Sequence, residues 1–110
     1  MSHQVVFSPE SLEQLAELFR YIAQAASPSI AADYTEAIVR YCESLSEFPL
    51  RGTKRDDVRP GLRISHYKKR TVIAFAVDEV QVSIIGIFYG GQDYESLLDD
   101  GSAEFGIRIS

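Results

Sequence analysis

Apolar positions in the first half of the chain recur every three or four residues, which is the period of an α-helix. After a short β-branched stretch at residues 4–7, Ser8 and Pro9 offer a capping hydroxyl and a proline suited to the first helical turn. The apolar face that follows consists of Leu12, Leu15, Ala16, Phe19, Ile22, Ala23 and Ala26. This pattern predicts a strand at residues 4–7 and an amphipathic helix over residues 9–26.

The same start signal returns at Ser27 and Pro28, so a second helix is expected directly after the first. Its apolar face consists of Ile30, Tyr34, Ala37, Ile38, Tyr41 and Leu45. This helix must end before Pro49, because a proline disfavours helical geometry in the residue before it. With so short a connection, the two helices are expected to form an antiparallel hairpin.

From residue 62 onward the apolar period changes to two, which is the period of a β-strand. The segments LRISHY (62–67), TVIAFAV (71–77) and VQVSIIGIFY (80–89) predict three strands, and the short polar turns between them favour an antiparallel meander. Gly90 and Gly91 end the last strand, and DYESLL (93–98) is compatible with one helical turn. The prediction is therefore an α+β fold, with a short N-terminal strand and an antiparallel helical hairpin packed on a small antiparallel β-sheet.

The middle strand of this meander is apolar on both faces. Val72, Ala74 and Ala76 alternate with Ile73, Phe75 and Val77. A sheet that is covered on one side carries polar residues on its free side. We therefore expect the second face to be covered as well, and a partner chain is a natural candidate.

The chain has 110 residues, 45% of them apolar and 25% charged, which predicts one folded domain. That domain is expected to span residues 1–98. The tail at 99–110 contains Gly-Ser and Glu-Phe pairs of the kind left by cloning sites, so part of it is expected to be foreign to the natural protein.

With a single cysteine, Cys42, and no Cys/His cluster, we expect no disulfide, metal or cofactor, and a reduced cytoplasmic protein. No apolar run is long enough to cross a membrane.

Charge is distributed very unevenly along the chain, whose net charge is −5. Residues 51–70 hold eight basic and two acidic side chains, net +6, which leaves net −11 on the rest. This basic segment has two interpretations. It is either a solvated loop and hairpin turn, or a patch for an acidic protein partner. The acidity of the remainder argues against direct binding of DNA by the chain alone.

The order of elements, the loop FPLRGTKRDDVRPGLR (48–63) and the ending IGIFYGGQDY (85–94) together resemble the ParE/RelE toxin superfamily, and its ParE branch more closely. The resemblance covers residues 4 to 98. In the loop, the positions that match the family are Pro49, Gly52, Arg59, Gly61, Leu62 and Arg63, and at the end of the last strand they are Gly90 and Asp93. Tyr89 stands where histidine is common, and Gly91 and Gln92 stand where basic residues are common.

The resemblance implies the toxin of a type II toxin–antitoxin pair, masked by a small cognate antitoxin. ParE-like members are linked to inhibition of DNA gyrase, whereas RelE-like members cleave mRNA on the ribosome. The missing cations at Gly91 and Gln92 favour gyrase. A binding module that keeps the fold without toxicity is a third interpretation. The expected partner-binding residues are Arg59, Arg63, Tyr67, Lys68, Arg70, Phe75 and Tyr89.

No pair of nucleophile and general base is evident, so we expect no catalytic residues. Ser65 and His66 are strand neighbours that point to opposite faces, and alternation places His66 on the inward side with Leu62 and Ile64. If the chain is a ribonuclease, Arg59, Arg63, Tyr67 and Tyr89 are the expected catalytic set, with Arg63 and Tyr67 on one strand face.

Overall fold

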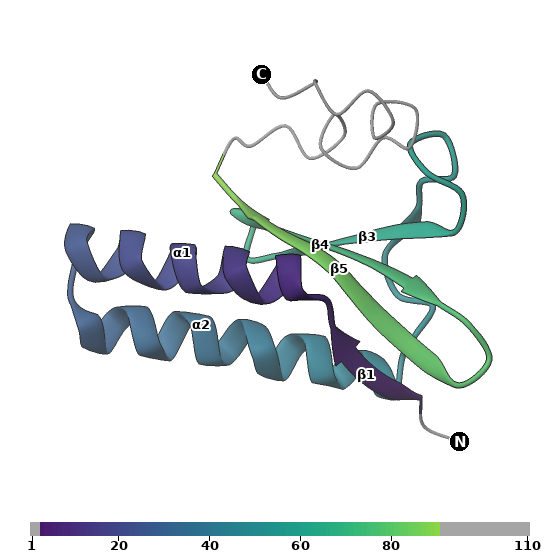
Figure 1. Cartoon of the computed structure of the whole chain (residues 1–110), viewed down its shortest axis with the longest axis horizontal. Helices are drawn as coiled ribbons and strands as arrows, with labels where there is room; N and C mark the ends of the chain where they lie inside the picture. Colours follow the sequence, from purple (N-terminus) through teal and green to yellow (C-terminus); the bar gives the residue numbers. More distant parts are fainter. Residues whose placement is uncertain (1–2, 91–110) are drawn as a thin grey trace.

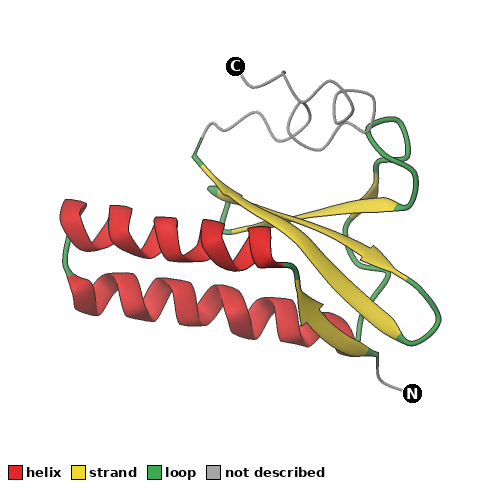
Figure 2. Cartoon of the chain, viewed as in Figure 1, coloured by secondary structure: helices red, strands yellow, loops and turns green. Residues whose placement is uncertain are grey.

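The computed structural model describes residues 3–90, which form two helices and a five-stranded sheet (Figures 1 and 2). The elements are β1 (Gln4–Phe7), α1 (Pro9–Ala25), α2 (Pro28–Glu43), the 3-10 turn η1 (Ser44–Ser46), β2 (Thr53–Lys54), β3 (Leu62–Tyr67), β4 (Thr71–Val77) and β5 (Gln81–Tyr89). Figure 1 shows α1 and α2 side by side as an antiparallel hairpin. The predicted α+β fold is confirmed. The expected helical turn at 93–98 and the tail at 99–110 lie outside the described residues.

The strands are ordered β1-β5-β4-β3-β2. β3, β4 and β5 form the predicted antiparallel meander. β1 instead lies parallel to β5, with Gln4 opposite Gln81 and Phe7 opposite Ile84, so the sheet is mixed. No tight turn joins these two strands, and nothing therefore forces them to run antiparallel. The two-residue strand β2, which pairs with β3, was not predicted.

Both helices begin where the sequence predicts. The Ser8 hydroxyl accepts a hydrogen bond from the Ser11 backbone N–H at 3.0 Å, and the Ser27 hydroxyl accepts one from the Ile30 N–H at 3.1 Å. Each cap precedes a proline in the first turn. Neither helix within residues 3–90 combines the length and apolar character needed to cross a lipid bilayer.

The buried side of α1 is rotated relative to the predicted apolar face. Leu12 is 51% exposed and Ala16 is also exposed. The buried residues of this helix are Ser11, Leu18 and Ile22. Gln14 fixes the orientation, because its Oε1 accepts a hydrogen bond from the Ile87 N–H of β5 at 2.7 Å. Docking against the sheet therefore decides which side of α1 is covered. On α2, Ile30 was likewise expected to be buried but is 54% exposed.

β5 carries a β-bulge at Ile85, opposite the step between residues 74 and 75 of β4. Before the bulge, Ile84 packs into the core beneath the helices, and after it Ile87 and Tyr89 do so. In an uninterrupted strand, Ile87 and Tyr89 would face away from the side occupied by Ile84. The bulge therefore turns the end of β5 toward the helices.

The chain itself covers much of the second face of the sheet. Leu62, Ile64, Ala74 and Phe88 form a separate cluster in which each residue is at most 3% exposed, with Val58 of the 55–61 loop packed against it. The expectation that this face is covered is confirmed for these four residues, but the chain itself covers them and they need no partner chain.

His66 was expected beside Leu62 and Ile64 on the inward side, but it is exposed. β2 pairs only with Arg63 and Ile64, so this strand ends before it reaches His66. His66 therefore shares a side of the sheet with Leu62 and Ile64, as predicted, but it is not buried there.

Candidate partner-binding surface

Five of the six tyrosines form one continuous series of ring contacts between the helices and the sheet. The series runs Tyr21, Tyr89, Tyr34, Tyr67, Tyr41, with successive centroid separations of 5.9, 6.0, 6.1 and 5.2 Å. Tilted and edge-on rings at such separations attract each other beyond simple area burial. We call these five residues the tyrosine cluster. The sixth tyrosine, Tyr94, lies outside the described residues.

Two tyrosines of the cluster come from α2 and contact hydroxyl groups of the sheet. Tyr34 and Tyr41 lie two turns apart on α2, and therefore on the same side of the helix. The Tyr34 hydroxyl lies 2.8 Å from Thr71 Oγ1, and the Tyr41 hydroxyl is hydrogen bonded to Ser65 Oγ. Thr71 and Ser65 are buried, so each phenol satisfies a hydroxyl that water does not reach. The tyrosine cluster is thus fixed to both layers of the fold.

Three exposed cations lie against rings of the cluster. The Arg51 guanidinium is 5.4 Å from the Tyr41 ring centroid. Lys68 Nζ is 5.8 Å from the centroid of Tyr67, and the Arg70 guanidinium is 5.9 Å from that of Tyr89. These separations fall within the range of cation–π attraction. The surface formed here is therefore both aromatic and cationic.

Other cations of the basic segment are paired within the loop. Arg55 donates two hydrogen bonds to the Asp57 carboxylate, both at 2.9 Å, and these hold the pKa of Asp57 below its ordinary value. Lys54 Nζ lies 3.8 Å from Asp56 Oδ2. The other carboxylate oxygen of Asp56 accepts a hydrogen bond from the Gly61 N–H at 2.8 Å. These charges stabilise the loop that connects β2 and β3.

The predicted partner-binding residues fall into separate places. Four of them come together at the tyrosine cluster: Tyr67, Lys68, Arg70 and Tyr89. Arg63 instead donates hydrogen bonds to the carbonyl oxygens of Leu50 (2.5 Å) and Arg51 (3.3 Å), and Arg59 is half-buried in the same loop. Phe75 is fully buried, so its assignment to a partner surface was wrong. Alternation along β4 could not tell which face the helices would cover.

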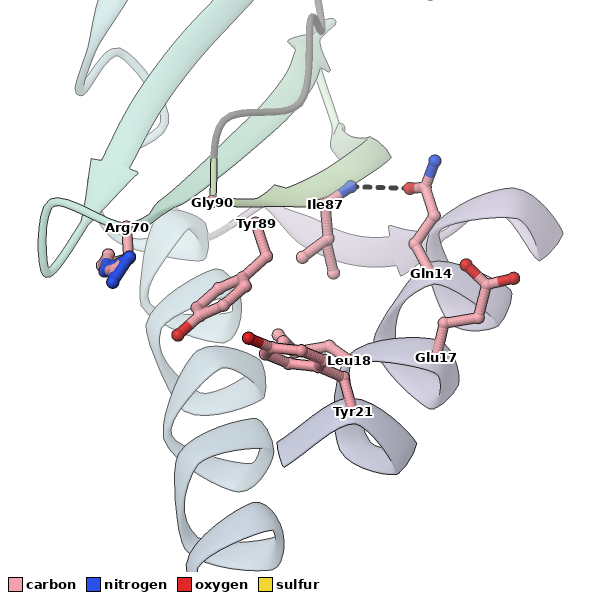
Figure 3. Close-up of a pocket in the computed structure, with 8 residues that line it drawn as sticks. All are labelled: Gln14, Glu17, Leu18, Tyr21, Arg70, Ile87, Tyr89 and Gly90. Atoms are coloured by element: carbon pink, nitrogen blue, oxygen red, sulfur yellow. Dashed lines mark hydrogen bonds between the residues drawn. The ribbon is translucent and has the colours of Figure 1, made fainter. Parts of the chain in front are cut away.

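A pocket of about 360 Å³ opens at the Tyr21 end of the tyrosine cluster (Figure 3). Its lining residues are Gln14, Glu17, Leu18, Tyr21, Arg70, Ile87, Tyr89 and Gly90. Leu18 and Ile87 are buried, whereas Tyr21 is 60% exposed. Figure 3 shows the side chains of Tyr21 and Tyr89 next to each other, with Arg70 at one edge and Glu17 at the other.

Sequence reasoning missed the contribution of α1 to this surface. Tyr21, Gln14 and Glu17 lie outside the predicted apolar face of the helix. The available signal was Tyr21 itself, a large aromatic residue on the side of the helix expected to face solvent. Its role depends on Tyr89, which only the β5 bulge brings within 5.9 Å.

Cys42 lies on α2 directly after Tyr41 and is fully buried, as predicted for a small apolar side chain. Burial raises the pKa of its thiol to about 12, with a smaller contribution from the charge of Glu43. The thiol is therefore protonated and unreactive near neutral pH. Within residues 3–90, no group of His, Cys, Asp and Glu side chains has the arrangement of a metal site.

Comparisons with known proteins agree with the observed fold. A chain of the chromosomal ParDE toxin–antitoxin system of P. aeruginosa superimposes with a TM-score of 0.71 at 17% identity, covering 81% of this chain and 97% of that one. A chain of the toxin–antitoxin complex RelBE2 of Mycobacterium tuberculosis superimposes with a TM-score of 0.59 at 20% identity, covering 84% and 95%. A comparison with curated protein sequences finds no match. The family model for the ParE toxin of the type II toxin–antitoxin system parDE matches residues 5–94, and the chain therefore belongs to the ParE toxin family.

Proposed function

We propose that this chain is a toxin that a cognate antitoxin holds inactive, and that the free toxin inhibits bacterial DNA gyrase in the cytoplasm. Membership of the ParE family supports the pairing with an antitoxin. The P. aeruginosa neighbour, which shares the fold, comes from a ParDE toxin–antitoxin system. Gyrase as the target follows from the resemblance to the ParE branch.

The observation that carries the proposal is the aromatic and cationic surface at the tyrosine cluster. Tyrosine and arginine are enriched among the residues that dominate protein–protein binding. A cationic rim on a chain of net charge −5 is also suited to an acidic partner, because complementary charge speeds association and fixes orientation. The surface therefore has the chemistry of a protein-binding site.

The positions of the histidines support binding over RNA cleavage. Metal-free cleavage needs a group that takes up a proton near neutral pH, which is most often histidine. His3 Nε2 lies 2.9 Å from the Asp78 carbonyl oxygen. His66 is exposed on one face of the sheet, whereas Tyr67 and the tyrosine cluster lie on the other face, so His66 does not point toward the cluster. Arg63, a member of the expected ribonuclease set, is held by loop carbonyls.

A RelE-type mRNA endonuclease is the second candidate. It is supported by Tyr67 and Tyr89, which both contact the ring of Tyr34, and by the cations Lys68 and Arg70 beside them. Two phenols and two cations within one surface are groups that could hold a phosphate. The chain also shares its fold with a chain of a RelBE2 toxin–antitoxin complex.

Supercoiling of relaxed plasmid by purified gyrase tests the proposal directly. The full-length chain is expected to inhibit supercoiling, while relaxation by a type I topoisomerase proceeds unchanged as the control. Primer extension on mRNA translated in vitro tests the second candidate in parallel. Cleaved mRNA with normal supercoiling would overturn the gyrase assignment. If neither activity changes, the chain is a non-toxic binding module of the same fold.

A further inference from the structure

The pocket at the Tyr21 end of the tyrosine cluster has an apolar interior and aromatic walls. Leu18 and Ile87 are 5% and 3% exposed, and Tyr21 at the opening is 60% exposed. Tyr89 forms the facing wall, and its ring lies 5.9 Å from that of Tyr21. Such a site suits one large apolar side chain, since burying it would remove an exposed aromatic surface from water.

Arg70 supplies an available positive charge at one edge of the pocket (Figure 3). Its guanidinium carbon lies 5.9 Å from the ring centroid of Tyr89, and it has no hydrogen bond or ion pair with any other side chain among residues 3–90. A guanidinium without such partners keeps its N–H groups available to bind a carboxylate in a bidentate manner. By contrast, Arg55 and Lys54 in the loop already face Asp57 and Asp56.

The backbone around Arg70 is fixed relative to the pocket. Its carbonyl oxygen accepts a hydrogen bond from the Gly90 N–H at 3.0 Å, which ties the hairpin to the end of β5. Its own N–H donates to the Lys68 carbonyl oxygen at 2.7 Å. The cation and the apolar interior are therefore presented in a set geometry, which lowers the entropy cost of binding.

We propose that this pocket receives a segment of the antitoxin in which a large apolar side chain lies next to Asp or Glu. The apolar side chain packs between Tyr21 and Tyr89, and the carboxylate pairs with Arg70. Glu17 at the opposite edge repels an acidic residue there, so the charges set the direction of the segment. The identity of the partner rests on the proposed function, whereas the chemistry of the segment rests on the pocket.

Tryptophan fluorescence tests this pocket, because the chain contains no tryptophan. The probes are two short blocked peptides that are identical except for the residue after a single Trp, which is Asp in one and Lys in the other. Titration with the full-length chain is expected to shift the Trp emission to the blue. The Trp-Asp peptide is expected to bind about fivefold more tightly than the Trp-Lys peptide, the effect of one partly exposed ion pair.

Arg70→Gln is expected to remove the discrimination between the two peptides. Lys54→Gln removes the same charge from the loop and is expected to preserve it. Tyr21→Ala is expected to weaken both peptides equally, whereas Ile30→Ala, at an exposed apolar residue of α2, is expected to leave both unchanged. Far-UV circular dichroism confirms that each variant is folded.

Equal affinity for the two peptides, or discrimination that survives Arg70→Gln, would overturn the proposal. Binding of a short single-stranded RNA, with neither peptide bound, would overturn it in favour of a nucleic-acid site. Supercoiling is measured on the same preparations. Loss of peptide binding with intact gyrase inhibition removes the pocket assignment alone, and the reverse result removes only the gyrase target.

Discussion

The loop at residues 51–63 and the hairpin turn at residues 68–70 share the basic segment but use their cations differently. The loop has five basic and two acidic side chains, whereas the turn has three basic side chains and no acidic one. In the loop, Arg55 and Lys54 face carboxylates and Arg63 binds carbonyl oxygens. In the turn, Lys68 and Arg70 lie against tyrosine rings. Apart from Arg51, which lies against the Tyr41 ring, the positive charge described here is therefore structural in the loop and available in the turn.

The two regions also differ in what a single substitution can disturb. The loop depends on backbone conformation at its glycines and on charge pairs that water surrounds. The tyrosine cluster depends on buried hydroxyl pairs between α2 and the sheet, such as Tyr41 with Ser65. Substitutions that disturb only the loop or only the tyrosine cluster therefore test this difference between the two regions.

The largest expected effect is that of Gly52→Ala in the loop. Gly52 has φ +85°, and a Cβ there would lie 2.4 Å from the Ile64 carbonyl oxygen. The left-handed backbone and the clash together are expected to lower the free energy of unfolding by about 3 kcal/mol. Urea denaturation measures the change.

Gly61→Ala is the matched control for that substitution. Gly61 has φ +79°, but a Cβ there would meet nothing within 4 Å. Only the backbone cost remains, about 1 kcal/mol. Equal losses in the two variants would show that close packing of Gly52 on β3 does not hold the loop in place.

A smaller loss is expected for Tyr41→Phe in the tyrosine cluster. The buried Ser65 hydroxyl would lose its partner, which is expected to cost about 1.5 kcal/mol of unfolding free energy. In the double variant with Ser65→Ala, the loss should be smaller than the sum of the two single losses. Additive losses in urea denaturation would mean that the two hydroxyls are not coupled.

The smallest expected effect concerns the ion pair of Asp57 with Arg55, which is largely exposed on the carboxylate side. Hydrogen bonding to Arg55 lowers the pKa of Asp57 in the folded state below the ordinary 3.8. A carboxyl whose folded-state pKa is depressed stabilises the fold above its unfolded pKa, and this contribution disappears as the pH falls through the folded pKa. Asp57→Asn should therefore reduce stability slightly at neutral pH and not at strongly acidic pH.

Denaturant midpoints measured across that pH range check this prediction, and Asp33→Asn on the exposed surface of α2 serves as the control. A difference between wild type and Asp57→Asn that persists in strong acid would show that the carboxylate charge is not its cause. High salt should also reduce the difference at neutral pH, because an exposed pair is screened.

Local signals in the sequence were sufficient for the elements of the fold. Ser8-Pro9 and Ser27-Pro28 mark both helix starts, and the change of period after Gly61 marks the meander. The side of α1 that is buried was not predictable in the same way. Apolar residues occur around more than half of that helix, and the contact between Gln14 and Ile87 selects among them.

The candidate surface was predicted only in part. Tyr67, Lys68, Arg70 and Tyr89 were named as partner-binding residues from the sequence and do come together. Tyr21 was not named, because its partner Tyr89 faces α1 only as a result of the β5 bulge. The local signs of that bulge in the printed sequence were the adjacent isoleucines 84 and 85, where strict alternation fails, and Gly86 inside the strand.

The amino-acid sequence by itself determined the two capped helices, the meander and the concentration of basic residues at 51–70, because each depends on neighbours in the chain. The tertiary structure alone decided that Phe75 is buried and that His66 is exposed. It also decided that cations of the loop pair with carboxylates, whereas cations of the turn lie against tyrosine rings. These outcomes depend on which face of the sheet the helices cover and on where one extra residue shifts the register. The covered face is set by contacts between residues more than seventy positions apart, such as that of Gln14 with Ile87, and the register shift is set by the pairing of β4 with β5.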